Sequence, residues 1–112
     1  MSTPSRFPNP VREALAEAKQ ALENLYGDRL KRLIVYGSQA RGDAGPDSDV
    51  DLLIVLDDDD VDPDTEAQRT SRLVVRIAAK HGVALSPLHL SRDHFQRDRP
   101  LPRAARREGI VL

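Results

Sequence analysis

Apolar residues return at steps of three and four positions in two stretches of this chain, which predicts two amphipathic helices. The first stretch covers residues 10–26, where Pro10 suits the first helical position and Gly27 suits the position just past the end. The second opens at Asp62-Pro63, has acidic residues in its first turn and ends before Gly82. A third, shorter helix is predicted to start at Pro100 or Pro102 and to run through Glu108.

Between the helices lie short apolar runs that are enriched in β-branched residues and typical of buried strands. They cover residues 31–36, 49–56 and 83–90. Pro87 interrupts the last run, which indicates an edge strand or a bulge, because proline cannot donate to a central sheet ladder. Strands that alternate with helices predict an α/β (α+β) protein, with helices packed on one small mixed sheet.

Length and composition limit the possibilities further. The chain has 112 residues and no cysteine, so we expect a flexible segment over residues 1–9 and a single domain over 10–112, without disulfides. It contains no apolar run near eighteen residues and no apolar signal core at its start, which predicts a cytoplasmic location without membrane contact. The net charge of −1 and four scattered aromatic residues argue against a nucleic-acid grip.

The chemistry suggested by the sequence lies between the first two strands. Gly37-Ser38 follows one apolar run, and Asp49-Val50-Asp51 opens the next after ten residues. A tight glycine turn can present backbone N–H groups and a hydroxyl to phosphate oxygens. Asp49 and Asp51 stand two positions apart on a strand, so both carboxylates are predicted to point the same way. Two carboxylates beside a phosphate are typical ligands of Mg²⁺.

This pattern, with Arg41 and Ser48 beside it, resembles the minimal nucleotidyltransferases of the DNA polymerase β-like superfamily. The resemblance implies a polymerase β-like nucleotidyltransferase fold and an enzyme that uses ATP with Mg²⁺ or Mn²⁺. It implies that Asp49 and Asp51 are catalytic metal ligands and that Gly37, Ser38, Arg41 and Ser48 bind the nucleotide. It also implies a partner, because members of this family act as antitoxins of HEPN toxins.

One departure from the family pattern concerns the third strand, where active members usually carry a third carboxylate. Here the strand reads Leu-Ser-Pro-Leu-His-Leu and has none. His89 is a candidate base, although a half-buried packing histidine is the preferred interpretation. Asp93 lies three residues past the expected strand end and is a weak substitute.

Two functions therefore stay open. The first is a nucleotidyltransferase that transfers AMP to a protein hydroxyl, namely a tyrosine of the HEPN toxin. The second is a weak or inactive antitoxin that neutralises its toxin by complex formation. The acidic run at residues 57–60 is interpreted as a solvated loop near the mouth of the site. The basic stretch from Arg97 to Arg107 is expected to form a partner-facing or nucleotide-facing surface.

Overall fold

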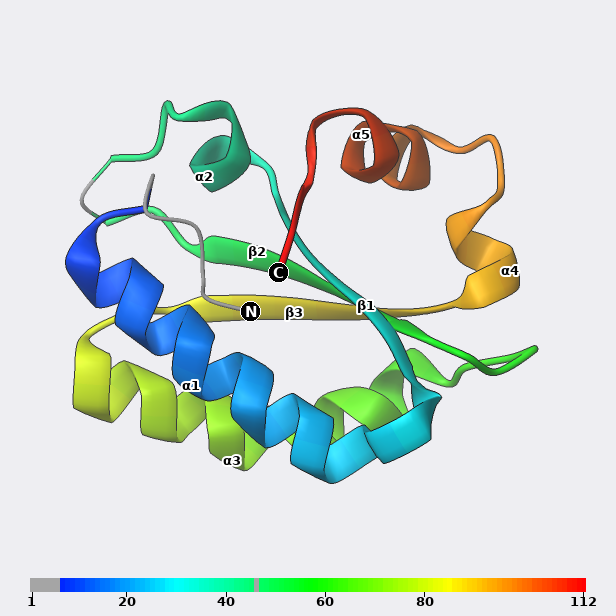
Figure 1. Cartoon of the computed structure of the whole chain (residues 1–112), viewed down its shortest axis with the longest axis horizontal. Helices are drawn as coiled ribbons and strands as arrows, with labels where there is room; N and C mark the ends of the chain where they lie inside the picture. Colours follow the sequence, from blue (N-terminus) through cyan, green and yellow to red (C-terminus); the bar gives the residue numbers. More distant parts are fainter. Residues whose placement is uncertain (1–6, 46) are drawn as a thin grey trace.

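The computed structural model describes residues 7–45 and 47–112 of the chain. In chain order it contains α1 (Asn9–Tyr26), the 3-10 turn η1 (Gly27–Arg29), β1 (Leu30–Tyr36), α2 (Ser38–Arg41), β2 (Val50–Leu56), α3 (Pro63–His81), β3 (Leu85–Ser91), α4 (Arg92–Phe95), α5 (Pro100–Glu108) and β4 (Ile110–Val111). The strands form one sheet in the order β3-β2-β1-β4, in which β2 runs antiparallel to β1 and parallel to β3. The predicted α/β class with one small mixed sheet is confirmed (Figure 1).

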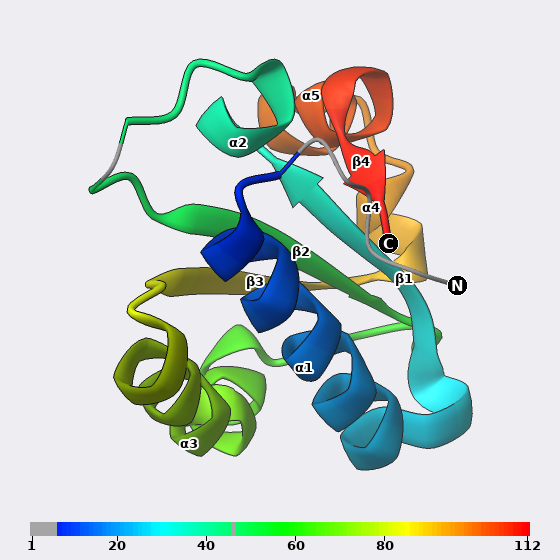
Figure 2. The ribbon, with the colours of Figure 1, turned by 60° about the vertical axis from the view of Figure 1, so that its left-hand side comes forward.

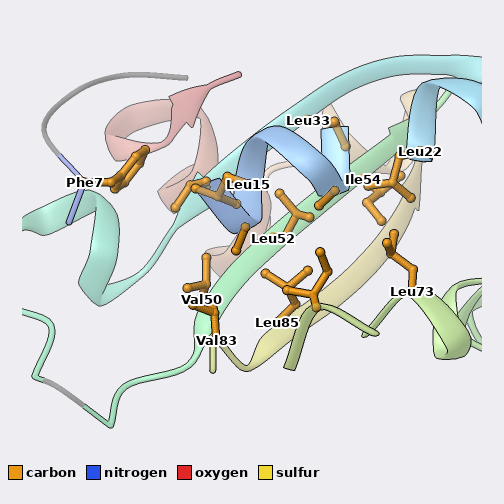
Figure 3. Close-up of a cluster of buried hydrophobic side chains, with 14 of the residues drawn as sticks. Phe7, Leu15, Leu22, Leu33, Val50, Leu52, Ile54, Leu73, Val83 and Leu85 are labelled. Atoms are coloured by element: carbon orange, nitrogen blue, oxygen red, sulfur yellow. The ribbon is translucent and has the colours of Figure 1, made fainter. Parts of the chain in front are cut away.

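One face of the sheet is covered by the two long helices, which lie side by side in Figure 2. Alternate residues of β1 and β2 point into this layer and meet the apolar stripes of α1 and α3. Figure 3 shows the resulting core, which includes Leu15, Leu22, Leu52, Ile54, Leu73 and Leu85. Of the start that was expected to be flexible, residues 7–9 are described: Phe7 belongs to the same core at 3% exposure, and Asn9 begins α1. Residues 1–6 lie outside the described residues.

The opposite face is covered by the shorter helices α2, α4 and α5 (Figure 2). Its apolar cluster is smaller and takes Leu53 and Val55 from β2, Phe95 from α4 and Ala105 from α5. Asp51 belongs to this face, because it stands two residues before Leu53 on the same strand. The two faces of β2 therefore have different roles: one is covered by long helices, and the other begins with a carboxylate.

Helix ends follow the sequence closely. Asp62 caps α3 by accepting a hydrogen bond from the Asp64 amide at 3.1 Å, and Gly82 ends that helix with φ of 67°. Ser91 caps α4 in the same way, through a 3.0 Å bond from the His94 amide. α1 begins at Asn9, one residue before the predicted start at Pro10, and Pro8 is the residue before the first turn. In the part of the chain that the structure describes, no helix is long and apolar enough to cross a membrane.

Pro87 is accommodated because β3 is an edge strand of the described sheet, as predicted. The Val50 amide donates to the Ala84 carbonyl at 2.8 Å, so in this parallel ladder alternate residues of β3 direct their backbone groups toward β2. Counting from Ala84, this set includes Ser86 and Leu88 but excludes Pro87. The missing N–H of Pro87 therefore belongs to the free edge and removes no bond from the sheet.

The C-terminal segment is part of the fold. The short strand β4 pairs with β1, and the Leu112 amide donates to the Leu33 carbonyl at 2.9 Å. Gly109 links α5 to β4 at a point where a Cβ atom would collide with the Ala105 carbonyl and with Ile34. The basic segment that ends at Arg107 is thus held between Phe95 and β4, and it is not a loose tail.

Candidate functional site

The turn between β1 and α2 places Gly37 directly beside a carboxylate. Gly37 has φ of 73° and ψ of −149°, a backbone conformation that residues with a side chain rarely adopt. A Cβ atom at this position would also collide with Oδ2 of Asp51. Glycine is therefore needed twice here, once for the backbone conformation and once for the close approach of Asp51.

The amides that follow the turn point to no partner. The first hydrogen bond of α2 runs from the Arg41 amide to the Gly37 carbonyl, at 3.1 Å. The amides of residues 38–40 consequently have no hydrogen-bond partner among the residues that the structure describes. Ser38, the first residue of α2, is half-buried, and its hydroxyl makes no hydrogen bond within the same described ranges. The segment thus offers donors close to Asp51.

Asp49 and Asp51 lie close enough for their charges to interact. Burial raises the pKa of Asp51 above its ordinary value, and the Asp49 carboxylate raises this pKa further. The charge of Arg41 opposes both effects. Asp49 is exposed and precedes β2 by one residue, whereas Asp51 is half-buried within the strand. Two carboxylates that repel each other at the end of a strand form a favourable place for a cation.

Tyr36 is a neighbour of this pair that the sequence did not single out. It pairs with Asp51 across the β1–β2 ladder, so their side chains share a face. Burial and the Asp51 carboxylate both raise the pKa of the Tyr36 phenol, which keeps its hydroxyl protonated. In the sequence Tyr36 is only the residue before Gly37. That it lies beside Asp51 depends on how β1 and β2 are aligned, which the sequence pattern does not show.

Arg41 is tied to two other acidic side chains in this state. Its Nε lies 3.2 Å from Asp43 Oδ2, and its Nη1 lies 3.5 Å from Glu108 Oε1 on α5. The side chain is 47% exposed, so these pairs are weak and exchangeable. Because the Arg41 charge also reaches Asp51, the residue lies at the site, but it is not paired with Asp51.

Ser48 has a local structural role in the loop before Asp49. Its hydroxyl accepts a hydrogen bond from the Gly45 amide at 2.9 Å, and its own amide donates to the Gly45 carbonyl at 3.2 Å. These bonds close the turn that leads into β2. The expected contact of Ser48 with a nucleotide stays a prediction. The Ser48 hydroxyl would have to contact the nucleotide while it also accepts the hydrogen bond from the Gly45 amide.

The register of β3 identifies the residue that stands beside the carboxylate pair. Asp51 pairs with Ser86, so Ser86 is the β3 residue on the face of Asp51. His89 pairs with Ile54 and points to the opposite face, where its ring meets Tyr26 with the ring centroids 6.0 Å apart. The prediction that His89 could act as the base is therefore wrong, and its interpretation as a packing histidine is confirmed. His89 is 2% exposed, and burial lowers the pKa of its imidazole ring.

Two acidic candidates lie away from the site. Asp93 is in the first turn of α4, at the far end of β3 from Ser86. The run at 57–60 follows the C-terminal end of β2, whereas Asp49 and Asp51 lie at its beginning, so the expectation that this run lies near the site is wrong. In residues 7–45 and 47–112, no group of three or more histidine, cysteine, aspartate or glutamate side chains is arranged to hold a metal.

A mixed sheet covered by two long helices, with a Gly-Ser turn against one carboxylate of the next strand and a second carboxylate just before that strand, is typical of the nucleotidyltransferase class of enzymes. The sequence profile of the nucleotidyltransferase domain matches residues 15–96. The chain belongs to this nucleotidyltransferase domain family.

Similar proteins agree with this assignment. Two proteins of Methanocaldococcus jannaschii are named "Putative protein adenylyltransferase", MJ0604 and MJ0141. MJ0604 is 35% identical over 85 residues, which are 76% of this chain and 78% of that protein. MJ0141 is 33% identical over 76 residues, 68% of this chain and 75% of that protein. A solved structure described as a "putative minimal nucleotidyltransferase" matches with a TM-score of 0.58 and 28% identity, over 97% of this chain and all of that one. The resemblance read from the sequence is confirmed at this level.

Proposed function

We propose that this nucleotidyltransferase transfers AMP from ATP to a hydroxyl group of a partner protein, with Mg²⁺ or Mn²⁺ held by Asp49 and Asp51. The observation that carries the proposal is the position of Asp51 against Gly37, between the unpartnered amides that follow the turn and the second carboxylate. Phosphate oxygens and a divalent cation complement these two groups of donors and acceptors.

The residues present fit a divalent cation by their chemistry. Both side chains supply hard oxygen ligands, and the mutual repulsion that raises the pKa of Asp51 would be relieved by a bound cation. Mg²⁺ is commonly bound through one or two carboxylates, with substrate phosphates and water as the other ligands. A pair without a third protein ligand is therefore sufficient for binding with a nucleotide. When bound, the metal supplies charge stabilisation to the transferring phosphoryl group.

The transfer itself is a substitution at the α-phosphorus. The acceptor oxygen forms a bond to that phosphorus, the bond to the bridging oxygen of the β-phosphate breaks, and pyrophosphate leaves. Gly37 and the amides after it hold the triphosphate, and Arg41 can leave Asp43 and Glu108 to meet the phosphates, because its pairs are exposed. The acceptor proton passes to water or to a phosphate oxygen, since position 86 carries a serine.

The relatives named for protein adenylylation support a protein acceptor. Recognition of the acceptor would then come from contacts with the acceptor protein itself. The family resemblance points to a tyrosine of a HEPN-type toxin, and the protein would then act as its antitoxin in the cytoplasm.

A second candidate is an antitoxin that acts by binding alone, and Ser86 beside Asp51 favours it. One experiment separates the two. The protein is incubated with each radiolabelled NTP and Mg²⁺, with and without the protein encoded beside it. Label transferred from ATP to that partner supports the enzyme, and the label should disappear in the double variant Asp49→Asn with Asp51→Asn. A stable complex without any transferred label supports the binder.

A further inference from the structure

A second cavity lies away from the carboxylate pair, at the free edge of the sheet. It has a volume of about 700 Å³ and is bordered by the loop before α3, by the end of β3 and by the segment from α4 into α5. Its β3 border consists of four consecutive residues, Leu88 to Ser91. Neighbouring side chains on a strand point to opposite faces, so four in a row can border one cavity only if it runs along the strand edge. The cavity is therefore an edge groove.

The groove has an apolar floor and a mainly basic rim. Leu90 is buried in it, and Val61 and Leu101 are half-buried on its two sides. Arg97 and Arg99 are exposed at the rim, and neither has an ion-pair partner in the described part of the chain. His94 is exposed on the same side, and Asp60 is the acidic residue on the opposite side.

Two neighbouring arginines differ from those at the rim, because each is paired with an acidic side chain of the same chain. Arg92 pairs with Asp57 at 3.2 Å and also with Asp59, and Arg103 pairs with Asp98 at 3.2 Å. Arg97 and Arg99 thus stay available to a ligand, whereas Arg92 and Arg103 are compensated within the chain. An apolar floor with uncompensated arginines complements an acidic segment with apolar side chains.

The groove and the carboxylate pair lie along the same strands. Asp51 pairs with Ser86, and four residues further along Val55 pairs with Leu90. At a rise of about 3.3 Å per residue, these two points are about 13 Å apart along β3. An extended chain of about four residues, lying along the free edge of β3, would span the distance from the groove to the site.

We propose that the edge groove docks the acceptor: an extended, acidic and apolar segment of the partner protein binds there, and a hydroxyl about four residues away reaches the carboxylate pair. This rests on the proposed function, and it assigns the surface that would hold the protein acceptor. Docking outside the reacting centre lowers the KM for the acceptor without changing the chemical step.

The test uses fluorescent ten-residue peptides with one tyrosine placed four residues from a Leu-Glu-Leu-Glu anchor, in both chain directions. In a parallel set the apolar anchor residues are varied among Leu, Ile, Val and Phe, and in a charge-swapped set Lys replaces Glu. Fluorescence anisotropy is measured for the wild type, for Arg97→Glu with Arg99→Glu, and for Arg72→Glu. Arg72 is exposed on α3 outside the groove, so its variant controls for a charge reversal elsewhere on the surface.

The acidic peptides should bind the wild type and the Arg72→Glu variant alike, and the Arg97/Arg99 double variant about tenfold more weakly. The charge-swapped peptides should prefer the double variant. In transfer assays, the double variant should raise the KM for the acidic peptide and leave kcat and the affinity for ATP unchanged.

Failure of either proposal gives a distinct result. Acidic peptides that bind none of the proteins, or that bind the double variant as well as the wild type, would overturn the docking proposal, even if label is transferred. Single-stranded RNA that binds the wild type but not the double variant would overturn it in favour of a nucleic-acid surface. A wild-type protein that binds the acidic peptides more tightly than the double variant does, but that does not bind ATP, would support docking and contradict the proposed chemistry.

Discussion

Both ends of β2 carry aspartates, but their charges are compensated by arginines at one end and repel each other at the other end. At the C-terminal end, Asp58 forms a two-point ion pair with Arg29, at 2.7 and 3.3 Å, and Asp57 and Asp59 pair with Arg92. At the beginning, Asp49 and Asp51 repel each other. The pKa of Asp58 is lowered by Arg29, whereas burial and Asp49 raise the pKa of Asp51.

The difference separates a structural acidic cluster from a binding site. Charges compensated within the chain contribute to stability and have little left for a ligand. Charges left uncompensated reduce the stability of the free protein and are stabilised when a cation arrives. Both ends look alike in the sequence, and the arginines that distinguish them come from residue positions far along the chain.

The largest expected effect separates the two ends by activity. Asp49→Asn with Asp51→Asn should reduce AMP transfer by more than about 100-fold, because both metal ligands are lost. The matched control is Asp57→Asn with Asp59→Asn, which removes two carboxylates at the other end of the same strand and should keep transfer within about threefold, a change of under 1 kcal/mol in the barrier. Transfer rates with radiolabelled ATP measure both, and equal losses would show that the ends do not differ in function.

Gly37→Ala should affect the active end through its geometry. Alanine at this backbone conformation should cost about 1–3 kcal/mol of folding stability, and its Cβ would displace Asp51. The matched control is Gly42→Ala, because Gly42 also has positive φ but a Cβ atom there meets nothing within 4 Å. We expect both variants to be less stable in urea, but only Gly37→Ala to lose nucleotide affinity in calorimetry. Retained affinity would mean that Asp51 does not have to lie against the turn.

Ser86→Asp should strengthen the active end by supplying a third carboxylate beside Asp51. If proton removal from the acceptor limits the rate, transfer should rise by about tenfold or more. Ser86→Asn has a similar shape without the charge and should give no increase. A Ser86→Asp variant that is no faster than the wild type would show that another step limits transfer.

The smallest effects have opposite signs at the two ends. The raised pKa of Asp51 means that its carboxylate reduces stability at neutral pH, so Asp51→Asn should stabilise the protein at pH 7. This gain should vanish as the pH falls below about 4, where the carboxyl is protonated in both states. Asp58 has a lowered pKa, so its carboxylate stabilises the fold at pH 7, and Asp58→Asn should cost about 0.2–1 kcal/mol there.

The Asp58→Asn loss should also disappear in acid, as the pH falls through the lowered pKa and the native carboxylate is itself protonated. Urea unfolding of the wild type and both variants between pH 3 and pH 7 measures the two curves. Two variants that change stability in the same direction at pH 7 would contradict the difference between the ends.

The parts of the fold that depend on local signals could be predicted from the sequence, whereas the parts that depend on how strands pair could not. Gly27, Gly82 and the Asp62-Pro63 pair mark helix ends by backbone chemistry that acts within a few residues, and the structure agrees with them. β4 has only two residues, and its place depends on pairing with β1, so no local pattern indicated it.

The candidate site shows the same limit. The turn and the two aspartates are separated by only ten residues in the sequence, and their closeness in space follows from the pairing of β1 with β2. Whether Ser86 or His89 faces Asp51 depends on the alignment of β3 with β2, and a shift of one residue would exchange their faces. The pairing of Asp58 with Arg29 likewise joins residues 29 positions apart, which charge counts along the chain do not reveal.

The most direct test places the metal at one end of β2. Backbone amide NMR spectra are recorded with a nonhydrolysable ATP analogue and Mg²⁺, and then with a small fraction of Mn²⁺, whose unpaired electrons broaden signals of nearby nuclei. We predict broadening at Gly37, Ser38 and Asp51, and unaffected signals at Asp58 and Asp59, about 20 Å further along the strand by its rise per residue. Broadening centred on Asp58 and Asp59, or signals that are unchanged at both ends, would contradict the account.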